Sequence, residues 1–364
     1  MDRLRETFRL RRYGLTLALA ALAWCAGFPL GHAALAAAGD TATPTSPVPM
    51  PQVTVVAPRA PTAEELAGDS VENFLIAHAR PSVATGQLAR WHAPVCAATL
   101  GLSQGFNAFV SARIAAVAAK VGAPSGAAGC KPNIHIYFTS DPQTVIEGVA
   151  KQAPELLGYH AVSETRKVTT ISHPIEGWYA TATEGDKGFV QLDQPVELNS
   201  SAEAPGTGSA RLQSKTPSGR AGSRLMAERS SLMVHVLILV DVRKVTGYEI
   251  GPISDYLAVL VLSQTRQQDA CGQLPSILDL MAPNCGREKP AAITAGDLAF
   301  LHALYKSELR TNYYVEKGSI ESKMLEDLEP LQPPYHNPSD NNRLAAFRRS
   351  IDDDADYDIT AIEV

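Results

Sequence analysis

The sequence predicts an α+β fold in which helices pack against a mixed sheet over residues 62–328. Residues 232–242 are apolar on both alternating faces, as expected of a central strand that is buried on two sides. Residues 105–121 carry apolar side chains at helical spacing. Residues 134–138 alternate between faces, which is typical of a half-buried strand. Helical and strand patterns within one continuous stretch favour a single mixed domain.

The first half of this domain begins with Thr62 and Glu65, whose spacing is that of a capping box before a helix. The remaining elements are predicted from apolar runs that are bounded by Gly, Pro or Asn. We expect helices at 71–78, 105–121 and 142–157, and strands at 90–96, 134–138, 167–171 and 177–183.

The second half contains the central strand and three further helices. Residues 199–223 are rich in Ser, Gly, Ala and Pro, so we expect a long mobile surface loop before the central strand. Pro252 is tolerated in the first turn of a very apolar helix. Thr294 and Asp297 have the spacing of a capping box, with Asp in the place of Glu or Gln. The helices are expected at 252–264, 294–306 and 320–328.

Residues 1–39 have the order of an export signal, with a basic head, an uncharged run and an alanine-rich end. Arg11 and Arg12 resemble a twin-arginine motif, with Leu10 where Ser or Thr is usual. The general and the twin-arginine export routes therefore both stay open. Either route places the mature chain in the periplasm or outside the cell.

Two polar segments flank the predicted domain. Residues 40–61 are rich in Pro, Thr and Ala and predict a flexible linker. Residues 53–59 form an apolar island within it and resemble the short N-terminal box by which outer-membrane transporters engage their energy-coupling protein. Residues 329–364 are first rich in Pro and Asn and then acidic, so we expect a mostly disordered tail.

Four cysteines follow the export signal, and an even number in an exported chain favours disulfides. Three pairings are possible, and we favour the two that are local in sequence, Cys96 with Cys130 and Cys271 with Cys285. A metal role is disfavoured because the chain has no Cys-x-x-Cys pair.

Composition excludes several function classes. The chain has a net charge of −6 at pH 7 and no dense Lys/Arg stripe, which argues against a nucleic-acid partner. After the export signal, no predominantly apolar run approaches the roughly 18–20 residues that cross a bilayer, so we expect no transmembrane segment in the mature chain. Nucleophile elbows and phosphate-binding glycine loops are absent, so we expect no nucleotide cofactor.

The C-terminal half, over residues 232–305, carries a resemblance to a known family. It combines a buried strand, an apolar helix, the segment Leu274-Pro275-Ser276-Ile277-Leu278, and the segment Ile293-Thr294-Ala295-Gly296-Asp297-Leu298 with its continuation to Tyr305. This order resembles the closing half of zincin metallopeptidases. That family has an active-site helix, a Ser-Ile-Met-like turn and a final helix that begins Leu-Thr-x-x-Asp.

The active-site helix departs from the family pattern. A zincin needs two His four residues apart with Glu beside the first, and the helix expected at 252–264 has no His. The resemblance therefore implies a degenerate zincin-like domain without a metal. The segments Arg90-Trp91, Pro94-Val95 and Pro132-Asn133-Ile134 also resemble an uncharacterised family of exported proteobacterial proteins, which implies no activity.

A few polar residues are candidates for a site. Asp255, near the start of an apolar helix, is either a first-turn acid favoured by the helix dipole or a buried functional carboxylate. His160 and His173 stand in a polar stretch and are candidates to converge in space. His135 and His235 lie on predicted strands, where we interpret them as hydrogen-bonded core residues.

The first hypothesis for function is an exported, non-catalytic zincin-like domain that binds an unknown protein or ligand of the cell envelope, without a metal or cofactor. An alternative is a periplasmic hydrolase or peptidase that uses Asp255 and Asp297, together with His160 or His173. A third hypothesis, an accessory protein of outer-membrane transport, rests on residues 53–59.

Overall fold

The computed structural model describes residues 58–127, 129–185, 188–196, 229–265, 271–283, 285–309 and 311–328. The predicted export signal, the loop expected at 199–223 and the predicted acidic tail lie outside the described residues, as does most of the predicted linker. Among the described residues, no helix is long and apolar enough to cross a membrane.

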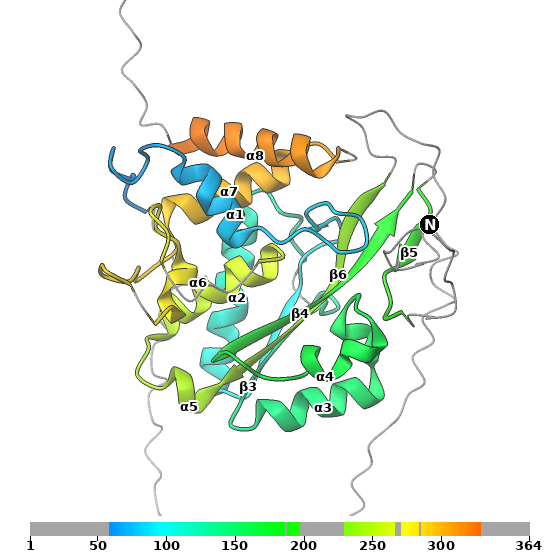
Figure 1. Ribbon diagram of the computed structural model, residues 1–364. Coiled ribbons are helices and arrows are strands. Elements are labelled where there is room, and N and C mark those ends of the chain that lie inside the picture. The colour runs from blue at the N-terminus through cyan, green and yellow to red at the C-terminus, as the bar shows by residue number, and fades with distance from the viewer. Residues whose placement is uncertain are drawn as a thin grey trace, which may run out of the picture. The chain divides into compact units, whose positions relative to one another are not determined.

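The predicted mixed sheet is present, and its strands follow the order β2-β3-β6-β4-β5 (Figure 1). The long central strand β6 pairs in parallel with β3 and, nearer its start, with β1. On its other side β6 pairs antiparallel with β4, which pairs antiparallel with β5. The strands are β1 (Arg90–Trp91), β2 (Ala97–Leu100), β3 (Ile134–Thr139), β4 (Ile175–Glu184), β5 (Val190–Leu192) and β6 (Ser230–Asp241).

Helices cover both faces of this sheet (Figure 1). The α-helices are α1 (Ser70–His78), α2 (Gln104–Lys120), α3 (Pro142–Gln152), α4 (Thr165–Val168), α5 (Val242–Val245), α6 (Ile250–Leu262), α7 (Ala295–Lys306) and α8 (Tyr313–Leu328). The 3-10 helices are η2 (Pro154–Leu157), η3 (Val162–Glu164) and η4 (Ile277–Met281). The larger core lies between one face of the sheet and α1, α2, α6, α7 and α8. The smaller core lies under α3 on the other face.

The strand alternation assigns residues to these two cores. Ile136 of β3 and Ile238 of β6 enter the larger core, whereas Leu237 and Leu239 of β6 enter the smaller one. Both faces of β6 are therefore buried along its second half, as its sequence predicts.

Four expected elements differ from the observed ones, three of them for a local reason. Thr62 and Glu65 exchange the capping-box hydrogen bonds, but the chain forms turns until α1 begins, because one turn does not repay helix nucleation. The strand expected at 90–96 is only two residues long. Pro154 ends α3, since a residue before proline disfavours the helical conformation. The strand expected at 167–171 is wrong, because this stretch contains the end of α4.

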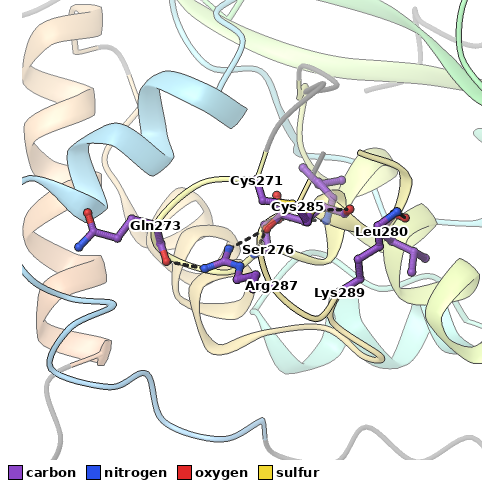
Figure 2. Close-up of a disulfide and its surroundings, with 9 residues drawn as sticks. Cys271, Gln273, Ser276, Leu280, Cys285, Arg287 and Lys289 are labelled. Atoms are coloured by element: carbon purple, nitrogen blue, oxygen red, sulfur yellow. Dashed lines mark hydrogen bonds and ion pairs between the residues drawn. A yellow bond between two sulfur atoms is a disulfide. The ribbon is translucent and has the colours of Figure 1, made fainter. Parts of the chain in front are cut away.

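Both predicted disulfides are confirmed. Cys96 and Cys130 join the start of β2 to the loop before β3. Cys271 and Cys285 close the segment that holds η4, between α6 and α7 (Figure 2).

Candidate functional site

The apolar helix that was compared with a zincin active-site helix is α6. It begins at Ile250, after the short helix α5 that follows β6, and every residue from Ile253 to Leu262 is buried. It packs against α2, η4 and α7. A helix that is apolar on all sides is stable only when neighbouring elements surround it, which explains its place inside the larger core.

Asp255 lies in the second turn of α6 and is 1% exposed. Arg113 of α2 donates two hydrogen bonds to its carboxylate, from Nε at 2.5 Å and from a terminal nitrogen at 2.9 Å. The backbone amide of Ile293 donates a third, at 2.9 Å. Asp255 is therefore a buried member of an ion pair, and the interpretation as a first-turn acid is wrong.

Arg113 was missed as a site residue, although the sequence contains a signal for it. Arg113 stands three residues after Val110 and four before Val117, on the apolar stripe of α2, and is itself buried. A cation on a buried stripe requires an anionic or carbonyl partner.

Asp297 joins the turn at η4 to the start of α7. It is fully buried and forms the predicted capping box with Thr294. Its carboxylate also accepts hydrogen bonds from the Ser276 hydroxyl at 2.6 Å and from the Ile277 amide at 2.8 Å. Burial raises the pKa of Asp297 to about 6, against the opposing effect of these donors.

A third buried carboxylate, Asp279, supports the same turn from inside the disulfide loop. It accepts hydrogen bonds from the Ser276 amide at 3.2 Å and from Arg287 at 3.0 Å. Arg287 also donates to the carbonyl of Gln273 at 2.7 Å. Burial raises the pKa of Asp279. Ser276 in the turn before α7 is thus hydrogen-bonded both to Asp279 of η4 and to Asp297 of α7.

A cavity of about 410 Å³ lies beside this turn. One wall comes from the end of the predicted linker and the turn that follows it, where Arg59 and Glu65 form an ion pair at 2.6 Å. The opposite wall comes from the start of α7 and the segment before it, including Pro290, Ala292 and Ile293. Ile293 separates the cavity from Asp255, which does not line it.

The structure does not bring the predicted histidines to Asp255. His160 is buried, and its Nδ1 donates to the carbonyl of Gly158 at 2.8 Å. The Nδ1 of His173 lies 3.3 Å from a Glu176 carboxylate oxygen. In the described part of the chain, no group of three or more His, Cys, Asp or Glu is placed to hold a metal ion.

Two other histidines do meet. His135 and His235 form a hydrogen bond with each other across β3 and β6. They were predicted to be hydrogen-bonded core residues, but both are only partly buried. Desolvation lowers the pKa of both, that of His235 to about 4.

Comparison with known proteins gives no match to a family model, to a curated protein or to a solved structure.

Proposed function

We propose that this protein is a non-catalytic, zincin-like domain that acts by binding a partner in the cell envelope. The proposal rests on Asp255, the one acid within the buried stretch of α6, because its carboxylate is bound by other groups of the protein. Its carboxylate is neutralised by Arg113 and accepts a further hydrogen bond from Ile293. A carboxylate held in this way is a structural group, since its two oxygens already accept three hydrogen bonds from the protein.

The zincin-like relationship is supported by a contact between the two motifs that suggested it. Ser276 and Ile277 of the turn both donate to Asp297 at the start of α7. The turn also lies against α6, which follows the central strand in the order that the resemblance requires. The similarity therefore involves segments that pack together, in addition to their order along the chain.

Loss of catalysis is supported by what replaces the zinc ligands. A zincin exposes two imidazoles and a carboxylate on one face of its active-site helix. In α6, all residues from 253 to 262 are buried, and apart from Ser254, Asp255 and Tyr256 they are apolar. Such a helix contributes core packing and offers no ligand set for an activated water.

Binding is assigned to the cavity beside α7. Its lining includes four prolines, Pro58, Pro61, Pro275 and Pro290, which keep the walls rigid and reduce the entropy lost when a ligand is bound. Its size falls within the range of ligand sites, and it is open to solvent.

The enzymatic alternative is tested with the mature chain and an unfolded protein substrate, with and without a metal chelator. We expect no hydrolysis under either condition. Hydrolysis that is lost on chelation, and lost in an Asp255→Asn variant that remains folded, would falsify the proposal.

The binding role is tested by crosslinking in isolated envelope fractions. Ala292→Trp fills the cavity, whereas Ala115→Trp adds the same side chain at an exposed position of α2. We expect a specific crosslinked species with the unmodified chain and with Ala115→Trp, and its loss with Ala292→Trp. Equal crosslinking by both variants would exclude this cavity as the binding surface.

A further inference from the structure

A pair of histidines lies on the face of the sheet opposite α6. His135 of β3 and His235 of β6 belong to neighbouring parallel strands. Ile134 and Val236, their neighbours in sequence, point into the larger core that contains α6. Because side chains alternate along a strand, both histidines point to the other face. This pair is therefore separate from the helix at which a zincin would bind zinc.

The two imidazoles are arranged so that two ring nitrogens converge. Nδ1 of His135 lies 2.8 Å from Nε2 of His235, and the ring planes are 24° apart. The ring of Tyr137 lies nearly parallel to that of His135, at a centroid distance of 6.3 Å. Both histidines are partly exposed to solvent.

A hydrogen bond between two neutral imidazoles uses one proton between the two nitrogens. The same two nitrogens can instead direct their lone pairs at one cation. Two nitrogens bound to one tetrahedral zinc ion at about 2.0–2.1 Å stand about 3.3 Å apart, which is about 0.5 Å more than the observed separation. Only a small outward movement of the rings is needed to exchange the proton for a metal ion.

We propose that His135 and His235 form a binding site for a divalent late transition-metal ion. Two imidazoles favour Cu²⁺, Ni²⁺ and Zn²⁺ over Ca²⁺ and Mg²⁺, and the order of affinities places Cu²⁺ first. No third His, Cys, Asp or Glu in the described part of the chain joins the pair, so water completes the coordination. The coordination positions that water occupies are therefore open for exchange with other ligands.

The surroundings of His235 limit the affinity of this site. Metal binding through Nε2 moves the ring proton to Nδ1, which is buried and has no hydrogen-bond partner among the described residues. Partners of this second ring nitrogen usually raise metal affinity about 10- to 100-fold. We therefore expect reversible, micromolar binding, as in a site that samples or relays an ion.

The site is tested by titrating Cu²⁺ into the mature chain without a His tag, followed by calorimetry and electron paramagnetic resonance. We expect one ion per chain at this site and nitrogen hyperfine structure from two imidazoles. His135→Gln and His235→Gln should each weaken binding at least tenfold, and Ca²⁺ should give no signal. His92→Gln, which removes an exposed imidazole elsewhere, should bind as the unmodified chain does.

Unchanged Cu²⁺ affinity in the double variant His135→Gln/His235→Gln would overturn the proposal, as would an equal loss in His92→Gln. A second measurement needs no substitution. Zn²⁺ added to the unmodified chain should shift the ring proton resonances of His135 and His235 before those of other histidines. Simultaneous shifts of all histidines would contradict the assignment. Neither readout depends on a partner or on hydrolysis, so this inference and the proposed function can fail separately.

Discussion

Arg90 of β1 and Glu316 of α8 form an ion pair inside the protein, although 226 residues separate them in the chain. Arg90 also donates to the carbonyls of Leu304 and Ser307 at the end of α7, at 2.6 and 2.7 Å. Glu316 accepts the amide of Leu88 at 2.9 Å. A short strand, the end of one helix and the start of another are thus joined at one buried point.

Glu316→Gln should destabilise the fold strongly, because it leaves the Arg90 guanidinium buried without a counter-charge. We expect a loss of about 3 kcal/mol in the free energy of unfolding, measured by urea denaturation. The control, Glu326→Gln, changes an exposed acid on the same helix and should cost less than about 0.5 kcal/mol. Similar losses in both variants would show that the ion pair contributes little.

The ion pair between Arg113 and Asp255 should behave as a coupled unit. Asp255→Leu and Arg113→Met should each cost about 3–5 kcal/mol, since each removes one member of a buried ion pair. The double variant Arg113→Met/Asp255→Leu should cost less than the sum of the single changes, because it removes both charges. The measurement is a double-mutant cycle on the free energy of unfolding, and strict additivity would contradict the expectation.

His78 should make the fold sensitive to acid. It is 1% exposed, both of its ring nitrogens lack partners among the described residues, and burial lowers its pKa to about 4. As pH falls below about 6.5, the unfolded chain binds a proton that the folded chain does not, so stability is lost progressively until about pH 4. The total contribution is roughly 3 kcal/mol.

His78→Leu should remove this acid sensitivity while leaving stability at pH 7 unchanged or higher, because no unpaired ring nitrogen remains buried. The measurement is the difference between unfolding free energies of the variant and the unmodified chain from pH 7 to pH 4. His92→Gln, at an exposed position, is the control and should parallel the unmodified chain. A constant difference between His78→Leu and the unmodified chain would contradict the assignment.

Gly158 and Gly122 offer a matched comparison of backbone strain with steric exclusion. Both have φ of 77°, where a side chain is disfavoured. A Cβ at Gly158 would overlap the carbonyl oxygen of Tyr179 in β4, whereas nothing lies within 4 Å of a Cβ at Gly122. Gly122→Ala should cost about 1 kcal/mol. Gly158→Ala should cost at least about 1 kcal/mol more, measured by thermal unfolding, and equal costs would contradict the overlap.

Local chemistry made much of the fold predictable. The helices α2 and α7 and the strands β3 and β6 repeat their apolar residues at the spacing of the element that they form. The capping box of Thr294 and Asp297 and the two sequence-local disulfides depend on short stretches of chain, and all three are confirmed. The break at Pro154 was also present in the sequence, since proline acts on the residue before it.

The sequence by itself therefore determined the mixed sheet and most of the helices and favoured the cysteine pairing that the structure confirms, because these depend on periodicity and on neighbours along the chain. Only the tertiary structure decided the partners of the buried charges and rings. Arg113 and Asp255 are 142 residues apart, and His135 and His235 are 100 apart. No local pattern specifies such pairs, because a buried polar group requires a partner without dictating from which element that partner comes.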